Sequence, residues 1–400
     1  MFEYIPYILF FIVLIILIIY IYIRLKFGFW AVQPVFHIYD VGYVFFPPGI
    51  INHTLPEQNK YTNFKNINTI LYSELSDIKK TQFVNFIKLH YLQNKDNIFA
   101  PTSDNVLPYF TSHSDKSFVS FYTEDNLIID LKKGTNVPDK KIIGIMSSRP
   151  IHIFINNGNK DAMFDAYYVD YLCVDKLFRK KGIAPQIIQT HHYNQRQLNK
   201  KICVSLFKRE DELTGIVPLC VYSTYGFSVD NWTKPSELHS QYKFIEINHQ
   251  NSHFLNDFIK LNYSNFDIII NTEITNIIEL IKTKNIFIYA IMVDDTFIAC
   301  YFFRKSCIFI DKNREVLSCF ASINNCDDNK IFVQGFKLSF WKIADENYFG
   351  FAAIENLSHN NLIIDNIIKK THPLIVSPTA YFFYNFAYPT FKPEKTLIIT

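Results

Sequence analysis

The hydrophobic pattern begins with an unbroken apolar run over residues 4–23 that contains no charged residue. At 1.5 Å per residue, a helix over this run spans roughly 30 Å, which is enough to cross the hydrocarbon core of a bilayer. A cleaved signal peptide is the alternative, but no basic segment precedes the run and no small-x-small cleavage site follows it. We therefore expect a transmembrane anchor over residues 1–24.

Charged residues flank this run unevenly. Glu3 precedes it, whereas Arg24 and Lys26 follow it directly. Because basic residues concentrate on the cytoplasmic side of membrane helices, this asymmetry predicts that residues 25–400 lie in the cytosol. No later stretch is long and apolar enough to cross again, so the pattern predicts a single-pass membrane protein.

After residue 25 the chain mixes short β-rich runs with helical segments, which is the pattern of an α+β or α/β protein. The first series contains strands over 141–157 with a break at Arg149-Pro150, a turn at 157–159, a strand over 164–174, a helix over 182–198 and a strand over 202–207. The second contains strands over 286–293, 296–309 and 315–323 and a helix over 331–345. The similarity of the two series predicts two lobes, residues 25–240 and 241–400, joined near residues 235–250.

Composition narrows the class of protein. Hydrophobic residues make up 49% of the chain and charged residues 19%, so it can bury a large core and is not a disordered tail. The 40 Lys and Arg residues against 37 Asp and Glu residues give a net charge of only +3, which argues against a dedicated nucleic-acid-binding protein. The seven cysteines contain no CxxC pair, and His249 and His253 lack the glutamate of an HExxH motif. We therefore expect reduced thiols and no metal site.

One segment carries candidate chemistry. Residues 168–185 read YVDYLCVDKLFRKKGIAP, in which a predicted strand leads through a basic stretch and Gly182 into a helix. The unpaired N–H groups and the dipole of a helix start attract phosphate, glycine lets the backbone approach it, and basic side chains add positive charge. The RxxGxA arrangement resembles the pyrophosphate loop of the GNAT acyl-CoA-dependent transferases. Taken alone, it also fits a basic, solvated helix start.

Four segments, in order along the chain, resemble the N-myristoyltransferases, whose fold is two GNAT-like lobes in tandem. Residues 26–35 (KFGFWAVQPV) are similar to the family's FWxTQPV segment, and residues 91–99 (YLQNKDNIF) to its Tyr-acidic-Asn-x-Phe loop. Residues 170–185 resemble its NFLCVHKxLRxKRLAP signature, and residues 381–400 (YFFYNFAYPTFKPEKTLIIT) its YYLYNW…P…EK…GLVL ending. The resemblance implies two lobes of mixed twisted sheet flanked by helices, preceded by the membrane helix.

The resemblance also implies an activity, the transfer of a myristoyl group from myristoyl-CoA to the N-terminal glycine of proteins, with no cofactor beyond this co-substrate. The backbone amides of Tyr171 and Leu172 would hold the oxyanion, and a terminal carboxylate on Thr400 would take the proton of the acceptor's α-ammonium. The implied CoA contacts are Phe29, Trp30, Cys173, Val174, Arg179, Lys180, Lys181, Gly182, Ile183 and Ala184, and the implied peptide contacts are Asp96 and Phe99.

The chain departs from the family in the segments that contact the peptide. The acidic loop is reduced to Asp96, and residues 375–380 (IVSPTA) replace the family's GxGDGxL loop. Two alternatives therefore stay open. One is a membrane-tethered module that binds acyl-CoA or an acylated peptide without turnover, and the other is a GNAT N-acyltransferase with another acyl donor.

Overall fold

The computed structural model describes residues 4–92, 97–130, 135–156, 158, 161–210, 215–311 and 314–400. The helices are α1 (Ile5–Lys26), α2 (Val41–Phe45), α3 (Asp77–His90), α4 (Ser103–Val106), α5 (Ile183–Leu198), α6 (Ser252–Leu261), α7 (Ile274–Lys282), α8 (Asn329–Asn347) and α9 (Asn360–Ile368). The strands are β1 (Gly49–Ile50), β2 (Ile67–Leu71), β3 (Ile98–Phe99), β4 (Phe118–Asp130), β5 (Thr135–Ile155), β6 (Ala162–Val174), β7 (Val204–Glu210), β8 (Cys220–Ser228), β9 (Lys243–Glu246), β10 (Ile268–Asn271), β11 (Ile286–Val293), β12 (Thr296–Asp311), β13 (Arg314–Asn324), β14 (Phe349–Glu355), β15 (Ile375–Tyr384), β16 (Phe386–Ala387) and β17 (Thr396–Ile399).

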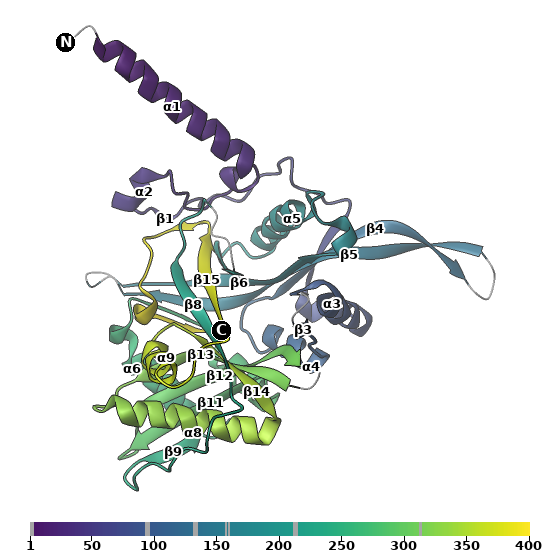
Figure 1. Ribbon diagram of the computed structural model, residues 1–400. Helices are drawn as coiled ribbons and strands as arrows, with labels where there is room; N and C mark the ends of the chain where they lie inside the picture. Colours follow the sequence, from purple (N-terminus) through teal and green to yellow (C-terminus); the bar gives the residue numbers. More distant parts are fainter. Residues whose placement is uncertain are drawn as a thin grey trace.

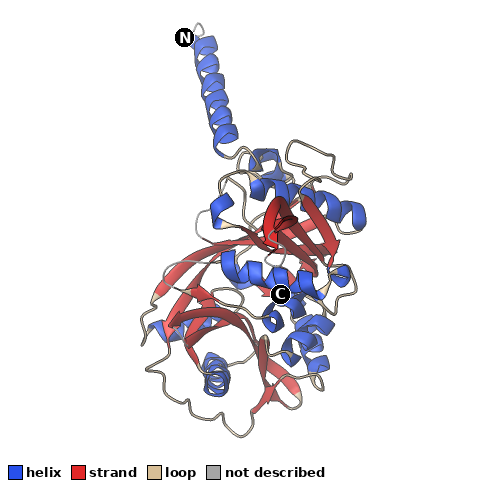
Figure 2. Cartoon of the chain, turned by 90° about the vertical axis from the view of Figure 1, so that its right-hand side faces the viewer, coloured by secondary structure: helices blue, strands red, loops and turns tan. Residues whose placement is uncertain are grey.

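One continuous twisted sheet runs through both halves of the chain (Figures 1 and 2). Strands β2, β4, β5, β6 and β7 form its first part, and β14, β13, β12, β11 and β9 form its second part. Between them, β15 pairs with β7 on one side and with β8 on the other, and β8 pairs with β14. At the other side of the first part, β17 pairs in parallel with β10, which pairs with β5. Strands from the end of the chain therefore complete the sheet of its first half.

Side-chain alternation along the strands places α3 and α5 on opposite faces of the first part of the sheet. Phe121 and Ile145 pack in the core that contains α3, whereas their neighbours Tyr122 and Met146 pack in the core that contains α5. Helices α8 and α9 cover the second part of the sheet, where their apolar residues join a separate core cluster. The mixed α and β class expected from the pattern is confirmed.

Most of the predicted elements are confirmed, with ends displaced by a few residues. The strands expected over 164–174, 202–207, 286–293, 296–309 and 315–323 are β6, β7, β11, β12 and β13, and the helices over 182–198 and 331–345 are α5 and α8. Of the turn expected at 157–159, only Gly158 is among the described residues. All seven cysteines are free thiols.

The predicted break at Arg149-Pro150 is wrong, because β5 runs unbroken through it. Proline has no N–H, and a strand tolerates it where no neighbouring strand requires that donor. β4 pairs with β5 as far as Ser148, and β10 pairs with it from His152 onward. Pro150 lies in the gap between these two neighbours, so the missing N–H interrupts neither ladder.

Helix α1 is apolar all round and exposed along its length, and it projects from the body of the molecule as a single rod (Figure 1). Residues 5–23 have the length and composition of a membrane span, and none of this segment is buried against the chain. A core helix of a soluble protein can match the length and composition, but it is covered by protein. The exposed surface of this segment therefore sets it apart from a core helix.

Candidate functional site

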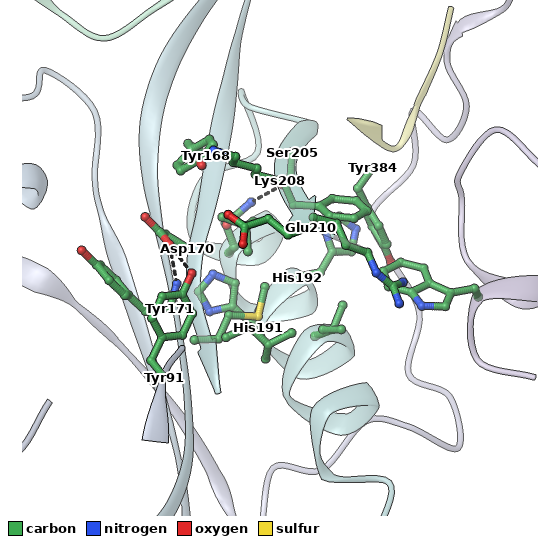
Figure 3. Close-up of a pocket in the computed structure, with 18 of the residues that line it drawn as sticks. Tyr91, Tyr168, Asp170, Tyr171, His191, His192, Ser205, Lys208, Glu210 and Tyr384 are labelled. Carbon is green, nitrogen blue, oxygen red and sulfur yellow. Dashed lines mark hydrogen bonds between the residues drawn. The ribbon is translucent and has the colours of Figure 1, made fainter. Parts of the chain in front are cut away.

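The parallel strands β6 and β7 separate along their length, and a cavity of about 480 Å³ occupies the opening (Figure 3). Their ladder begins at Ala166↔Val204 and ends at Val169↔Phe207. Beyond this point β7 keeps its pairing with β15 on its other edge, while β6 continues along β5. The cavity is lined by residues 168–172 of β6, by residues 205 and 207–210 of β7, by one face of α5, and by Trp30, Tyr91, Leu92, Met146 and Tyr384.

A bulge in β6 lies in this wall of the cavity. The register of β6 on β5 shifts between Ile145 and Ser147, and Tyr171 and Leu172 stand there where a regular strand has one residue. Tyr171 has a backbone φ of 52°, in the left-handed region that a residue with a Cβ seldom adopts. Because a bulge leaves its extra residue unpaired in the ladder, backbone N–H groups at this point can be directed toward a ligand.

The N–H of Tyr171 donates to the carboxylate of Asp170 at 2.8 Å. The same carboxylate oxygen accepts a hydrogen bond of 3.4 Å from the hydroxyl of Tyr91, and a guanidinium nitrogen of Arg149 lies 3.7 Å from the other oxygen. Figure 3 shows Asp170, Tyr171 and Tyr91 together on one side of the cavity. A carboxylate therefore engages one of the two N–H groups expected to hold an oxyanion, and its negative charge opposes a second anion there.

The expected pyrophosphate loop leads from β6 into α5. Gly182 is the N-cap residue of α5 and has a φ of 75°, a conformation that glycine adopts without steric cost. Lys180 and Lys181 are exposed beside it, Ile183 is buried beneath the first turn, and Ala184 is half-buried. The first N–H groups of α5 and two lysines thus lie at one exposed point, which is an arrangement that binds phosphate.

Three residues expected to contact CoA belong to the framework of the protein. Arg179 donates to the backbone carbonyl of Val174 at 3.2 Å and to that of His90 at 2.9 Å, so it joins the end of β6 to the end of α3. The side chains of Cys173 and Val174 are buried in the two cores on either side of the sheet, and neither lines the cavity. Any contact of these two residues with CoA would use their backbone.

Trp30 closes one side of the cavity. Its ring stacks on that of Phe207, with centroids 5.6 Å apart. Phe29 packs edge-on against Trp30 and against Tyr61, at 5.1 Å in each case, and supports Trp30 from outside the cavity. A ring nitrogen of His37 lies 2.8 Å from the carbonyl oxygen of Trp30 and fixes this turn of the chain.

Of the two residues expected to contact a peptide, Asp96 lies outside the described residues. Phe99 is buried in β3, which pairs with β12, and its ring packs against that of Tyr91 at 5.6 Å. Tyr91 lines the cavity and Phe99 does not. Phe99 is therefore placed as a support for Tyr91.

Thr400 follows β17 and is buried, with 1% of its surface exposed. Its carbonyl oxygen accepts a hydrogen bond of 3.3 Å from Arg304 of β12. Thr400 does not line the cavity, whereas Lys208 does. Glu355 forms ion pairs with both Arg304 and Lys208, and it therefore links the residue that bonds Thr400 to the wall of the cavity.

Glu355 is the centre of this buried polar cluster. It lies at the end of β14, 3.3 Å from the ammonium of Lys208, paired with Arg304, and 2.6 Å from the hydroxyl of Tyr222. Burial alone would raise the pKa of this carboxyl, but the charges of Lys208 and Arg304 and the Tyr222 hydrogen bond lower the pKa to about 2. Glu355 is therefore ionised at neutral pH and holds two half-buried cations.

The face of α5 in the cavity carries two neutral histidines. His191 hydrogen-bonds through both ring nitrogens, to the hydroxyls of Ser120 and Ser148 at 2.8 Å each. The ring of His192 packs against that of Tyr384, with centroids 4.7 Å apart. Burial is the main cause that lowers the pKa of His191 to about 4 and that of His192 to about 3, so neither is charged at neutral pH.

Reasoning from the sequence missed the polar residues of the cavity, which include Asp170, Lys208, His192 and Gln195. For the α5 residues a signal was available, because Gln195 lies four positions after His191 and therefore on the same buried side of the helix. For Asp170 no local pattern marks the bulge. Lys208 depends on an ion pair with Glu355, 147 positions away along the chain, which no spacing indicates.

One family model and several solved structures are similar to this chain. Residues 55–220 match the family model of the myristoyl-CoA:protein N-myristoyltransferase N-terminal domain. A Saccharomyces cerevisiae N-myristoyltransferase structure with bound myristoyl-CoA matches with a TM-score of 0.67 and 13% identity, over 91% of this chain and 94% of that one. A second such yeast structure gives a TM-score of 0.69 and 12% identity, over 92% and 90% of the two chains.

A tandem GNAT protein from the clavulanic acid biosynthesis pathway also matches, with a TM-score of 0.53 and 8% identity, over 81% of this chain and 99% of that one. No curated protein sequence matches the chain. The structural likenesses show a tandem GNAT-like fold, as the resemblance implied. The match over residues 55–220 shows that this part of the chain is similar to the N-terminal domain of the N-myristoyltransferases. The lobe boundaries at residues 24 and 240 stay a prediction.

Replacing Glu355 by glutamine leaves the half-buried Lys208 and Arg304 beside an uncharged partner. Breaking such a buried pair costs about 3–5 kcal/mol, so we expect E355Q to lower the unfolding free energy by that amount at neutral pH. Because the pKa of Glu355 is lowered in the folded state, from 4.5 to about 2, its contribution is present above pH 4.5 and is lost as the pH falls toward 2. Urea unfolding of the detergent-solubilised full chain should show the difference between parent and variant narrowing over this range.

The control for this measurement is Asp295→Asn, which removes an exposed ion pair with Lys243. Exposed pairs contribute about 0–1 kcal/mol, so this variant should unfold almost as the parent does. Equal losses in the two variants would contradict the central position of Glu355.

Proposed function

We propose that the protein transfers a myristoyl group from myristoyl-CoA to the N-terminal glycine of protein substrates. The observation that carries this proposal is the cavity between β6 and β7, which has a strand bulge in its wall and lies beside a phosphate-binding helix start. These features occur in a chain whose residues 55–220 match the N-myristoyltransferase family model, and the similar yeast enzyme is described with bound myristoyl-CoA.

In this proposal CoA binds along the open end of the two strands. Its pyrophosphate lies on the first N–H groups of α5 and on Lys180 and Lys181. The pantetheine arm enters the opening between β6 and β7, and the thioester carbonyl reaches the N–H groups of Tyr171 and Leu172. Because the N–H of Tyr171 donates to Asp170, the thioester oxygen has to displace this carboxylate as it gains charge.

The reaction forms one C–N bond and breaks one C–S bond. The α-ammonium of the acceptor glycine first gives a proton to a base, and the neutral amine then attacks the thioester carbon. The tetrahedral oxyanion collapses, CoA leaves as a thiolate, and this thiolate takes the second proton from the former amine nitrogen. The products are an amide and the thiol form of CoA.

We assign the base to a terminal carboxylate on Thr400. Its support is the burial of Thr400 in the sheet edge that adjoins β5, where a carboxylate is removed from bulk water. Desolvation raises the basicity of such a group, whereas the neighbouring Arg304 favours the anion and lowers it. Two opposing effects, the burial of the Thr400 carboxylate and the positive charge of Arg304, therefore set its basicity.

The second candidate function is a module that binds acyl-CoA without turnover. Asp170 favours it, because its carboxylate holds the N–H of Tyr171 and puts a negative charge where the oxyanion would form. Binding of an uncharged thioester needs neither that N–H nor a base, so this module would retain CoA affinity and lack transfer.

We also propose that α1 anchors the protein in a membrane by a single pass, with residues 25–400 on the cytosolic side. Beyond the exposure of α1 itself, a second apolar surface supports this. We call it the α2 patch, and it consists of residues exposed by 58–82%: Ile38, Val41, Val44, Phe45 and Phe46. Figure 1 shows α2 beside the base of α1, and Asp40 is the only charged residue of segment 38–46.

A lipid surface is the partner that fits the α2 patch, because the patch continues from a helix with the length of a membrane span. The patch is also fixed to the cavity. The ring of His37 lies 3.0 Å from the Asp40 carboxylate and 2.8 Å from the carbonyl oxygen of Trp30, which lines the cavity. Contact of the patch with lipid would therefore place the acyl-CoA site close to the bilayer.

The full chain in detergent should transfer radiolabelled myristate from myristoyl-CoA to Gly-initiated peptides and not to N-acetylated versions of them. Replacing both Lys180 and Lys181 by alanine should raise KM for myristoyl-CoA about tenfold and change kcat little, because these side chains contact only the phosphate. Lys369→Ala, at an exposed site directly after α9, is the matched control. Tight CoA binding by the parent with no product from any peptide would favour the binding module.

Adding one residue after Thr400 moves the carboxylate away from its buried position. If this carboxylate is the base, kcat should fall by about 10²-fold or more, while affinity for CoA stays unchanged. Thr400→Ser keeps the carboxylate in place and serves as the control. Undiminished transfer by the extended chain would overturn the assignment of the base.

Contact of the α2 patch with lipid can be measured on the full chain in vesicles that contain brominated lipids. Tryptophan at position 45 should show blue-shifted emission and strong quenching relative to the parent, because the side chain enters the interfacial region. The control is Leu261→Trp on α6, since Leu261 and Phe45 are each 72% exposed. Equal quenching of Phe45→Trp and Leu261→Trp would contradict a lipid contact, while proteolytic protection of α1 tests the anchor separately.

A further inference from the structure

The second half of α5 buries polar side chains, some of which line the cavity. Gln189, His191, His192, Gln195 and Arg196 are each exposed by 8% or less. A helix that covers a sheet usually presents apolar residues to it, as the first half of α5 does with Ile183 and Ile187. The buried polar side chains in the second half of α5 therefore require hydrogen-bond partners.

Two of these side chains line the cavity and leave a polar atom unpaired. Nδ1 of His192 and Oε1 of Gln195 have no hydrogen-bond partner among the described residues, although each atom is buried. The other end of the Gln195 amide lies 3.5 Å from the hydroxyl of Ser205, which also lines the cavity. By contrast, His191 is satisfied by two serines.

The unpaired atoms lie at the closed end of the opening between β6 and β7. The first turns of α5 pack near Gly144, which pairs with Val174 at the open end of β6. His191 hydrogen-bonds to Ser148, which pairs with Val169 where the β6–β7 ladder ends. The fourteen residues from Gly182 to Gln195 thus run about 20 Å from the loop at the start of α5 to the closed end.

A bound acyl-CoA would run in the direction of α5, from Gly182 toward Gln195. This placement of the ligand rests on the proposed function. With its phosphates at Gly182 and its thioester at the bulge of Tyr171, the acyl chain continues toward His192 and Gln195. Figure 3 shows His191 and His192 above α5 in the space between β6 and Tyr384. The part of the cavity that receives the end of the chain is therefore its polar part.

An unsubstituted hydrocarbon would leave these polar atoms buried without hydrogen-bond partners, which is unfavourable. A hydroxyl group removes this cost, because it donates one hydrogen bond and accepts others. The neutral ring of His192 and the amide of Gln195 offer both an acceptor and a donor. We propose that the cavity selects an acyl-CoA whose chain carries a hydroxyl group near its distal end, held by His192 and Gln195.

The test measures equilibrium binding of CoA, tetradecanoyl-CoA, decanoyl-CoA and 12-hydroxytetradecanoyl-CoA to the full chain in detergent. We expect the hydroxylated compound to bind about tenfold more tightly than tetradecanoyl-CoA, which corresponds to about 1.4 kcal/mol. Replacing His192 by phenylalanine or Gln195 by leucine should reverse this preference, since the closed end becomes apolar. Affinity for CoA itself reports folding and should stay unchanged in both variants.

Gln189→Leu is the matched control, because Gln189 lies on the same helix with an unpaired buried Oε1 but does not line the cavity. It should leave the preference of the parent intact. Tighter binding of tetradecanoyl-CoA by the parent, with no change of preference in the variants, would overturn the inference and leave the proposed function standing. Decanoyl-CoA binding best would also overturn it, since water would then fill the closed end. Failure of every CoA compound to bind would refute the proposed function as well.

Discussion

The cavity depends on one constraint, the pairing of β7 with β15. β7 has two edges, and along residues 205–210 one of them is committed to β15. Because β15 also pairs with β8 and so belongs to the second part of the sheet, it directs β7 away from β6 after Val169↔Phe207. The opening between two parallel strands is thus a consequence of joining the two parts of one sheet, and the bulge at Tyr171 lies where β6 has lost this neighbour.

Buried charge joins the same parts of the sheet. Lys208 comes from β7, Glu355 from β14 and Arg304 from β12, and Arg304 bonds the residue that follows β17. Glu355 is buried, Lys208 and Arg304 are half-buried, and removal of Glu355 takes the paired carboxylate from both cations. The cluster therefore requires all four strands in place, and it connects a wall of the cavity to the last residue of the chain.

Local pattern predicted the elements and the glycine turn that leads into α5, since apolar periodicity and the residues around Gly182 are read within one segment. It failed at Pro150, where the tolerance for proline arises from a gap between two neighbouring strands that no local pattern reveals. It also gave no sign of Asp170 beside the bulge or of the pairing of β15 and β17 with strands of the first half. These features depend on residues that meet from distant positions, so their identity is set by the fold as a whole.

The position of β15 and β17 in the sheet also governs how the protein can be made. Synthesis delivers α1 and the strands of the first half before residues 375–384 and 396–399, which are required at β7 and β10. Until then the edge of β7 is unpaired, and an unpaired edge is open to wrong partners. Pairings of such long sequence separation also fold slowly. A nascent chain whose apolar helix has already left the ribosome must therefore hold an incomplete sheet until β15 and β17 arrive, and a product that ends before β15 lacks the strand that pairs with β7 beside the cavity.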